Sequence, residues 1–463
     1  MFDSSKRSFF SVKGFFFRNT GIRHNSKFLL NALRLFWILL IFYGEILTFY
    51  FSVKNAAWPT DPAWTAKGNE GVTHISLIAD PQLVDYHSYN HSGARLLLEQ
   101  IFTDTYLAKS YFFVKRLKRP SKVIFLGDLL DGGREWTDLE WEKEWRRFKS
   151  IFKVSSSDRT RNRELHFMAG NHDIGIGDKL VTWAVHRHRN YVGPLNYVVP
   201  IGDHVLVVLD TIGYVNNDPM VSAESHRFLK SVVESYPQKR KILFTHVPLY
   251  RAPNTSCGPL RQKKSRSIEY AKGYQYQTLT DPENSNEILT LLKPEMVFSG
   301  DDHDNCVVDH FVEGKVIPEG VDLPSFGLLS LYTKPTNSRP SLSSKPLPRE
   351  LFTSSFLPFQ LQTYITYALC FVVSLFLILV DLLWVGVVKK KIDLLPTTLD
   401  SPKFLPSKKG ISVIYSGGIF AKKYMNPIRT AGSWLFKFSQ SVFYVAKFAA
   451  ILFLLTLTAF FYI

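Results

Sequence analysis

Cysteine is scarce in this sequence, which has only three among 463 residues. Three cysteines cannot build a disulfide scaffold, so the fold must rest on a packed core, for which the chain is long enough. Cys370 lies inside a long apolar run, which leaves Cys257 and Cys306 as the two cysteines able to pair. From the residues alone, a bond between them and two unpaired thiols both stay open.

Acidic residues are also few, with 40 Asp and Glu against 56 Lys and Arg and a net charge of +16. Such an excess is typical of nucleic-acid-binding proteins, but its distribution argues against that class. Residues 1–34 hold seven Lys or Arg against one Asp, and residues 389–440 hold ten Lys or Arg against two Asp. These segments carry +6 and +8, so the rest of the chain has a net charge of only +2. Because the excess flanks apolar runs, we expect a membrane protein that binds no nucleic acid.

Charge is almost absent from three long apolar runs, at residues 35–53, 361–388 and 441–463. Each reaches or approaches the roughly 20 residues needed to cross a bilayer. Only Glu45, Asp381 and Lys447 interrupt them. We predict three transmembrane helices with the basic segments in the cytoplasm, so that the chain between the first two helices is luminal.

Other interpretations of these runs stay open. All three could be buried core helices, and Glu45 favours this most for the first run. A cleaved signal peptide is a further alternative there, but its lead of 34 residues is too long and no small-residue cleavage site follows before Trp58. The last run could also be a GPI-attachment signal, against which Lys447 and the preceding run argue.

The predicted organisation has eight parts. They are a cytoplasmic tail (1–34), a transmembrane helix (35–53), a linker (54–70), a luminal domain (71–334), a tether (335–360), a second transmembrane helix (361–388), a cytoplasmic basic segment (389–440) and a third transmembrane helix (441–463). Asn90 and Asn254 begin N-glycosylation sequons on the luminal side. Residues 251–283 form a long polar loop, which we predict to be a lid.

Five β-rich segments of the luminal domain end in Asp, Asn or His. They are THISLIAD at Asp80, KVIFLGD at Asp128, LHFMAGNHD at Asn171, His172 and Asp173, KILFTH at His246, and MVFSGDDH at Asp301, Asp302 and His303. Helical spacing over residues 91–118 predicts a βαβ unit and a partly parallel sheet. Because α/β sheets place their chemistry at the C-terminal edge, we expect these groups to meet there and hold metal ions.

Hydrolysis of a phosphate ester needs an activated water and neutralised phosphoryl oxygens, and two divalent ions about 3.5–4 Å apart supply both. Asp128 is the natural bridge between two such ions, with Asp80 on one and Asn171 on the other. His172 could protonate the leaving group, because imidazole titrates near neutrality, and Asp173 could orient it. Any one of these residues alone is more often structural, for example a helix cap. Five such motifs together indicate a metal site.

The order of these motifs resembles that of the calcineurin-like metallophosphoesterases over about residues 72–332. Within them, ADPQ, GDLLDGG, AGNHDIG, THVPLYR and GDDHDNC are similar to the endoplasmic-reticulum branch that trims ethanolamine phosphate from GPI anchors, the branch of post-GPI-attachment-to-proteins factor five and its fungal relatives. The resemblance implies an α/β fold of two packed sheets, a β-sandwich flanked by helices, plus the transmembrane helices. It makes Asp80, Asp128 and His303 ligands of one ion, and Asp128, Asn171, His246 and Asp301 ligands of the other.

The sequence departs from the family at two positions, since His is usual where Gln82 and Asp301 stand. Gln82 keeps an amide oxygen that can coordinate. Exchanging two imidazoles for oxygen donors favours Mn²⁺ over Zn²⁺, so we expect two divalent ions, Mn²⁺ above all. Asp302 fits less well as a ligand, and it could equally be the hydrogen-bond partner of a ligand. Cys306 lies where the branch also tends to have a cysteine, which favours a Cys257–Cys306 bridge.

The resemblance implies a phosphodiesterase of the endoplasmic-reticulum membrane that removes ethanolamine phosphate from a GPI mannose by in-line attack of a metal-bridging hydroxide. GPI-anchored proteins would be its substrates and cargo-export machinery a further partner. Asp131, Glu135 and Trp136 could receive the ammonium group, although they could equally pack a helix start. Arg251 could bind a phosphate or glycan oxygen, or form a surface salt bridge.

Two rival functions remain. One is a phosphoprotein or lipid phosphatase of the secretory pathway. The other is a non-catalytic receptor that binds Mn²⁺ or GPI-anchored cargo, which the two replaced histidines keep open.

Overall fold

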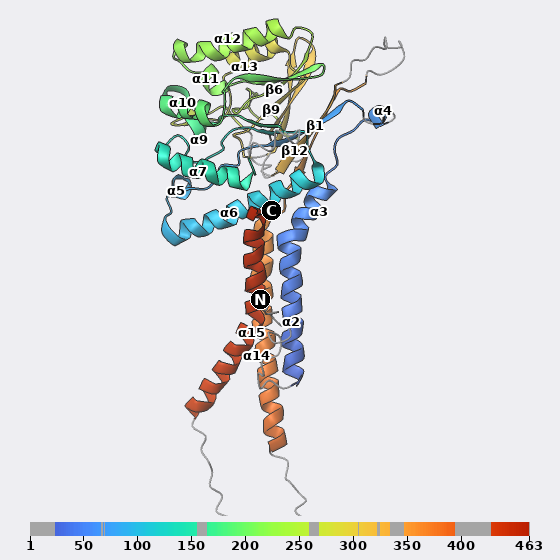
Figure 1. Ribbon diagram of the computed structural model, residues 1–463, viewed down its shortest axis with the longest axis vertical. Helices are drawn as coiled ribbons and strands as arrows, with labels where there is room; N and C mark the ends of the chain where they lie inside the picture. The colour runs from blue at the N-terminus through green and yellow to red at the C-terminus, as the bar shows by residue number, and fades with distance from the viewer. Residues whose placement is uncertain are drawn as a thin grey trace, which may run out of the picture. The chain divides into compact units, whose positions relative to one another are not determined.

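The computed structural model describes residues 24–393 and 427–462, apart from residues 66–67, 69, 155–163, 259–267, 304, 322–324 and 334–346. Most of the predicted cytoplasmic tail, the first part of the tether and much of the basic segment lie outside the described residues. The chain forms two compact units. One comprises the chain up to Gly44 with Phe359–Leu454, and the other comprises Glu45–Pro358 with the chain from Leu455 (Figure 1).

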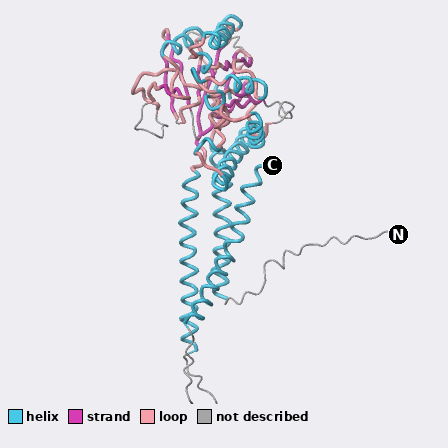
Figure 2. Tube along the Cα trace, turned by 90° about the vertical axis from the view of Figure 1, so that its left-hand side faces the viewer, coloured by secondary structure: helices cyan, strands magenta, loops and turns pink. Residues whose placement is uncertain are grey.

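Long helices make up the first unit (Figure 2). They are α2 (His24–Phe42), α14 (Gln360–Asp393) and the part of α15 (Pro427–Tyr462) up to Leu454. A π-helical turn (Tyr43–Leu47) leads from α2 to α3 (Thr48–Asn55), which belongs to the second unit. Among the residues that the structure describes, three stretches are long and apolar enough to cross a membrane, namely Lys27–Asn55, Gln360–Val385 and Trp434–Phe460. Within this unit, the Trp37 indole donates to Ser374 Oγ (3.1 Å), and the Arg34 guanidinium lies 3.4 Å from the Tyr444 ring centroid.

Two sheets form the centre of the second unit. The first has the order β13-β12-β1-β2-β3, with β1, β2 and β3 parallel and the other two antiparallel. Its strands are β1 (Val72–Ile78), β2 (Lys122–Phe125), β3 (Glu164–Phe167), β12 (Ser325–Tyr332) and β13 (Glu350–Phe356).

The second sheet has the order β10-β11-β9-β6-β5-β4 and is parallel from β11 to β5. Its strands are β4 (Tyr197–Ile201), β5 (His204–Val208), β6 (Arg240–Phe244), β9 (Met296–Ser299), β10 (Cys306–Val312) and β11 (Lys315–Val321). One core cluster joins buried residues of both sheets, including Ile75, Ile124, Leu206 and Ile242. The sheets therefore pack face to face.

Side chains alternate across each strand, so the outer face of each sheet needs its own cover. In β2, Val123 and Phe125 pack against α6 (Gly93–Phe113) and α7 (Asp138–Ile151). The second sheet packs against α12 (Pro219–Ser235) and α13 (Pro282–Leu292). Further described helices are α4 (Pro62–Thr65), α5 (Tyr86–Tyr89), α9 (Asn171–Ile174), α10 (Thr182–Tyr191) and α11 (Thr211–Tyr214), and a short hairpin joins β7 (Lys272–Gly273) to β8 (Tyr276–Gln277). The predicted class, α/β with two sheets flanked by helices and apolar helices besides, is confirmed.

Strand β13 was not predicted, because its residues fall in the expected tether. It pairs antiparallel with β12 at the edge of the first sheet. Its sequence, ELFTSSF, is too polar to show a strand pattern. Glu350 at its start accepts hydrogen bonds from His204 and Arg240 of the second sheet, which ties the two sheets together at this end.

A disulfide joins Cys257 to Cys306, with a sequence separation of 49. It attaches the predicted lid loop to the first residue of β10. Closing a loop of this length stabilises the fold by about 4 kcal/mol through loss of chain entropy in the unfolded state. We therefore expect the Cys257→Ser/Cys306→Ser double variant to lose about that much free energy of unfolding in denaturant titrations. Cys370→Ser, in the other unit, is the matched control, and an unchanged unfolding midpoint for the double variant would contradict this role.

Candidate metal centre

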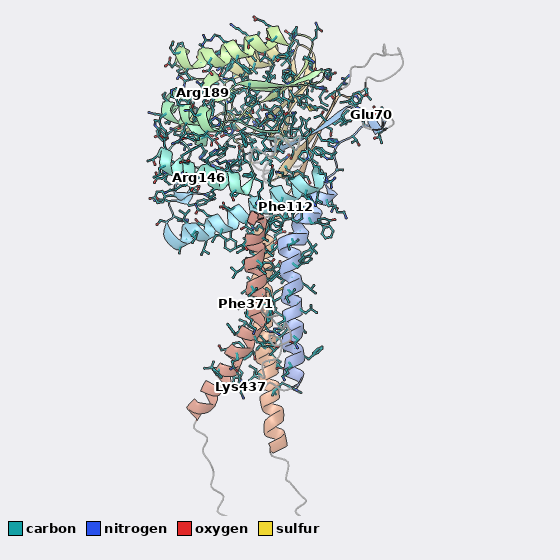
Figure 3. The ribbon with its side chains drawn as sticks, viewed as in Figure 1. Glu70, Phe112, Arg146, Arg189, Phe371 and Lys437 are labelled. Carbon is teal, nitrogen blue, oxygen red and sulfur yellow. A yellow bond between two sulfur atoms is a disulfide. The ribbon has the colours of Figure 1, made fainter. Side chains whose placement is uncertain are left out.

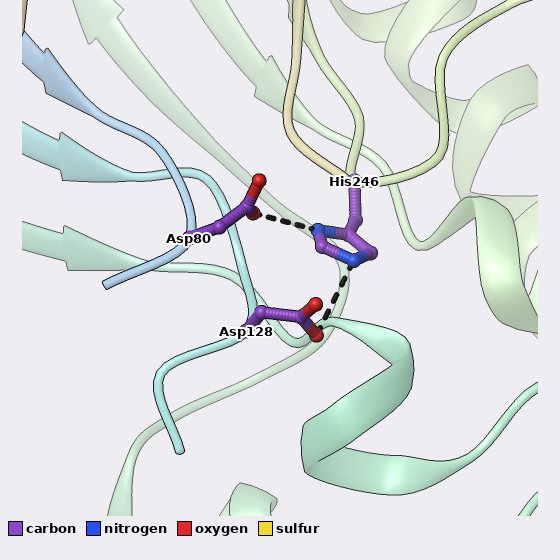
Figure 4. Close-up of side chains that lie close together, drawn as sticks. All are labelled: Asp80, Asp128 and His246. Carbon is purple, nitrogen blue, oxygen red and sulfur yellow. Dashed lines mark ion pairs between the residues drawn. The ribbon is translucent and has the colours of Figure 1, made fainter. Parts of the chain in front are cut away.

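Three residues from three separate strands converge at one edge of the sheets (Figure 4). Asp80 follows β1, Asp128 follows β2 and His246 follows β6. Each offers a ligand atom, and these atoms all lie within 4.8 Å of one another. All three side chains are buried, at 5% exposure or less. The structure thus brings together three of the residues that the sequence marks as metal ligands.

The His246 imidazole is fixed by the main chain. Its Nδ1–H donates to the Leu126 carbonyl oxygen (2.8 Å), so Nε2 is the nitrogen left to bind a metal ion. Nε2 lies 3.1 Å from Asn171 Oδ1, 3.3 Å from Asp128 Oδ1 and 3.8 Å from Asp301 Oδ1. Three oxygens and one nitrogen therefore face a common point, an N/O set that suits a borderline divalent ion such as Mn²⁺ or Zn²⁺.

Asp80 lies on the other side of His246. Its Oδ2 accepts the Asp301 backbone N–H (2.7 Å). Its Oδ1 is buried and has no hydrogen-bond partner among the described residues. A buried carboxylate oxygen without a donor is costly, and a bound cation would satisfy it.

Glycines of the motifs make room for these ligands. A Cβ on Gly300 would lie 2.5 Å from Asp80 Oδ1, and one on Gly170 would collide with Asp128 Oδ1. The backbone is also strained, since five site residues have left-handed φ: Asp80, Gln82, Asp128, Asp301 and His303. Such strain costs on the order of 1–3 kcal/mol per residue and clusters at functional sites.

The electrostatics of the site favour a cation. Burial raises the pKa of Asp80 well above its usual value, and burial raises that of Asp301 to about 6. Burial also acts on Asp128, but His246 and His172 outweigh it and hold the Asp128 pKa well below its ordinary value. Two buried carboxylates, Asp80 and Asp128, and the partly exposed Asp301 thus share one imidazole at close range. Divalent ions would balance this excess negative charge, so the residues present fit a metal centre.

Asp131, and not Asp173, orients His172. The His172 Nδ1 lies 2.7 Å from the Asp131 carbonyl oxygen and 3.0 Å from Asp131 Oδ1. Asp173 instead accepts the backbone N–H groups of Leu129, Leu130 and Gly170. The predicted role of Asp173 was wrong, because its short side chain is used to pin the GD turn to the GNHD turn. Burial opposes protonation of His172, but Asp128 and Asp131 outweigh it and raise its pKa to about 9.

A cavity of about 440 Å³ opens beside His172. Of the predicted site residues, it is lined by Gln82, Asp131, Glu135, His172 and His303. His303 is exposed on this wall and lies outside the buried three-residue group. The Gln82 amide nitrogen donates to Asp131 Oδ1 (2.8 Å), so its free amide oxygen is the atom available for a ligand role. Asp302 lies 3.9 Å from Arg251.

Two predicted substrate residues face elsewhere. The Trp136 indole donates to Asp85 Oδ2 (2.7 Å) and packs edge-on against His87, so it supports the cavity wall without lining it. Arg251 is only 4% exposed, and its guanidinium donates to Cys306 Sγ (2.6 Å) beside the disulfide. Proximity to a motif in sequence did not show on which side of the chain these side chains lie.

Sequence reasoning missed Tyr89 and Arg134, which also line the cavity. Arg134 donates to the carbonyl oxygen of Asn171 (2.9 Å) and so fixes the turn that carries this residue. Its position three residues after Asp131, within GDLLDGGRE, was the only available signal. The two predicted glycosylation residues, Asn90 and Asn254, are both exposed.

Glu319 supports the site from behind. It is 1% exposed and accepts hydrogen bonds from Leu249 N (2.9 Å), Ser299 Oγ (3.0 Å) and His310 Nε2 (2.7 Å). These bonds tie the loop after His246 to the strand that leads to Asp301. Burial opposes ionisation of Glu319, but His310 holds its pKa below the usual value.

We expect Glu319→Ala to lower the free energy of unfolding by about 3 kcal/mol, because it leaves buried donors unpaired. Since the folded-state pKa of Glu319 lies below its ordinary 4.5, its contribution is fully present above that pH and is lost as the pH falls. Denaturant titrations at pH 7 and pH 4 would check both points. Glu313→Ala, an exposed position, is the control, and an equal midpoint at pH 7 would contradict the prediction.

Residues 74–305 match the calcineurin-like phosphoesterase family. Cell division control protein 1 of Saccharomyces cerevisiae is 36% identical over 316 residues, which cover 64% of this chain and 62% of that protein, so the chain spans less than two thirds of this relative's length. Metallophosphoesterase 1 of Gallus gallus is 26% identical over 67% of this chain and 80% of its own length. Metallophosphoesterase 1 of Xenopus laevis is 24% identical over 62% of this chain and 74% of its own length.

Proposed function

Because the chain belongs to the calcineurin-like phosphoesterase family, we propose that it is a phosphodiesterase with a binuclear metal site. The observation that carries this proposal is the buried convergence of Asp80, Asp128 and His246, with Asn171 and Asp301 facing the same imidazole nitrogen. Asp128 would bridge the two ions, most suitably Mn²⁺. Asp80 and His303 would complete one site, and the residues around His246 Nε2 the other.

Two divalent ions held here would supply an activated water and neutralise the phosphoryl oxygens. The chain's own residues do the rest. His172, held by Asp131, can donate a proton to the leaving oxygen. Its backbone N–H donates to Asp128 Oδ1 (2.9 Å), which keeps the imidazole beside the ligand cluster. The cavity on this side gives the substrate access to both groups.

Ethanolamine phosphate on a GPI mannose is the proposed substrate, and the motif resemblance is its main support. The cavity adds chemical support, because Asp131, Glu135 and Tyr89 line it and can receive an ammonium group through charge and an aromatic face. His303 and His172 lie on the same wall, so the phosphate and the ammonium would occupy one cavity.

An endoplasmic-reticulum membrane location with a luminal catalytic domain is part of the same proposal. Three helices long and apolar enough to cross a membrane support membrane attachment. The disulfide and the two exposed sequon asparagines support an oxidising, glycosylating compartment for the second unit. GPI-anchored proteins would then be its substrates, and cargo-export machinery would receive the trimmed products.

Mass spectrometry of GPI glycans tests this substrate. Cells that lack the protein should retain an additional ethanolamine phosphate on a mannose, and wild-type protein should remove it. His172→Ala should fail to remove it although the protein is present at the same level. Glycans with unchanged ethanolamine phosphate content in all three cases would refute the substrate, and the phosphoprotein and lipid phosphatase alternatives would then be tested with the same variant.

A further inference from the structure

Helix α6 (Gly93–Phe113) carries one continuous face along its whole length. Residues three or four positions apart lie on the same side of a helix. By this spacing, one face holds Leu97, Leu98, Ile101, Thr105, Lys109 and Phe112. The two halves of this face have different surroundings.

The C-terminal half of the face is covered by the ends of two candidate membrane spans that belong to the same unit. Thr105 Oγ1 donates to the Leu457 carbonyl oxygen (3.2 Å). Phe112, labelled in Figure 3, packs edge-on against Phe460 with ring centroids 5.2 Å apart. Leu457 and Phe460 are at the end of the span Trp434–Phe460, so α6 meets that span at its edge.

A buried ion pair fixes α6 to the other span. Lys109 pairs with Glu45, and the two side chains are 1% and 2% exposed. The rings of Phe49 and Phe460 lie 5.6 Å and 5.9 Å from the Lys109 ammonium. Removing either partner would leave a buried charge uncompensated, so the pair holds α6 in one register.

The position of Leu457 and Phe460 along their span places α6 at the membrane surface. A helix needs about 20 residues to cross the hydrocarbon core, and the candidate span Trp434–Phe460 has 27, with Leu457 and Phe460 among its last four. Their contacts therefore put the face of α6 at the level where apolar lipid gives way to head groups.

The N-terminal half of the same face is uncovered within the described chain. Leu97 is 57% and Leu98 54% exposed, and Ile101 is partly exposed. Arg95 beside them is exposed, as expected for a helix that meets head groups. The apolar face is continuous with the surface that packs on the spans, and that continuity identifies what covers it.

We propose that the N-terminal half of α6 lies in the surface of the lipid bilayer, with Leu97 and Leu98 inserted among the lipids. The helix is thus an interfacial element of a domain that is otherwise outside the membrane.

The cavity is attached to this helix. Gln100 of α6 donates its amide to the Val84 carbonyl oxygen (3.1 Å), and Val84 lines the cavity. Tyr89, on the same cavity wall, is 63% exposed, and His91 just beyond it contacts Glu99 of α6 (2.9 Å). The cavity wall therefore lies at the bilayer surface, and the enzyme takes phosphodiesters that are anchored in the membrane. This second step rests on the proposed function.

Depth-dependent fluorescence quenching tests the membrane contact without any turnover. The full chain in a Cys370→Ser background would carry Leu98→Cys labelled with an environment-sensitive fluorophore, in nanodiscs of phosphatidylcholine and phosphatidylserine. Met220→Cys, 84% exposed on α12, is the matched control. Nitroxide lipids labelled near the head group should quench position 98 at least threefold more than position 220. Equal quenching at the two positions, confirmed with Leu97→Cys, would overturn the proposal. The proposal would also be overturned if, in detergent, a second copy of the chain or a protein partner covered position 98.

Two substrates test the second step. For Leu97→Glu/Leu98→Glu, hydrolysis of soluble bis(p-nitrophenyl) phosphate should be unchanged, because the variant does not touch the site. Hydrolysis of hexadecyl p-nitrophenyl phosphate in phosphatidylcholine vesicles should fall at least tenfold in kcat/KM. Unchanged hydrolysis of both would overturn the proposed access from the membrane. If the wild type hydrolysed neither, the phosphodiesterase proposal would fail, while the quenching result would still decide the membrane contact.

Discussion

Asp128→Asn is expected to lower kcat/KM for bis(p-nitrophenyl) phosphate by about a thousandfold, since losing one preorganised charge at a reacting centre costs about 10²–10³ and this carboxylate serves both proposed ions. Asp128 lies 3.3 Å from His246 Nε2 and accepts the His172 backbone N–H, so it also joins the metal cluster to the proton donor. The amide keeps the shape of the side chain and removes its charge. The detergent-solubilised full chain, assayed with Mn²⁺, would give the ratio.

Asp309→Asn is the matched control, because it makes the same chemical change at an exposed position of β10. Its kcat/KM should equal that of the wild type. Wild-type turnover by Asp128→Asn would contradict the catalytic assignment and favour a receptor that only binds metal.

Mn²⁺ is expected to stabilise the second unit by about 4 kcal/mol when present at a thousandfold excess over its Kd, because it binds only the folded state. The physical reason is the crowding of buried carboxylates. Burial raises the pKa of Asp80 and of Asp301, so the site without metal destabilises their charged forms. Thermal unfolding followed by tryptophan fluorescence, with Mn²⁺ or with a chelator, would measure the difference in Tm.

Asp80→Asn separates metal binding from a general salt effect. Removing this charge relieves repulsion in the metal-free protein and weakens binding, so the Tm shift caused by Mn²⁺ should shrink markedly. An equal shift in wild type and variant would show that Mn²⁺ acts elsewhere on the chain.

The parallel part of the sheet and the metal cluster were accessible from the sequence because they follow from one rule. Apolar runs such as KVIFLGD and KILFTH end in a ligand, and parallel strands bring their C-terminal ends to one edge. Asp128 and His246, far apart in sequence, could therefore be placed together before their distance was known. The glycine before Asp128 or Asn171 belongs to the same rule, since a Cβ there would meet a ligand.

Other features depend on contacts that no local pattern encodes. Strand β13 is polar at Thr353, Ser354 and Ser355, and only its pairing with β12 makes it a strand. Asp131 rather than Asp173 reaches His172, because side-chain direction in two facing turns decides which carboxylate is near.

Glu45 shows the same limit in the membrane spans. It was interpreted as an interruption of an apolar run, which weakened the prediction of a span. In the structure, its partner is Lys109 on a helix that follows the first strand of the sheet. A charge in an apolar run thus became informative only once its partner was known.

Counting bound metal tests the central claim most directly. Full-length protein purified with Mn²⁺, dialysed and analysed by inductively coupled plasma mass spectrometry should hold two ions per chain, and Asp128→Asn should hold one or none. Two ions in the wild type would match a centre built by Asp80, Asp128, Asn171, His246, Asp301 and His303. A wild-type chain that retains no metal, or that binds the same amount as Asp128→Asn, would contradict it.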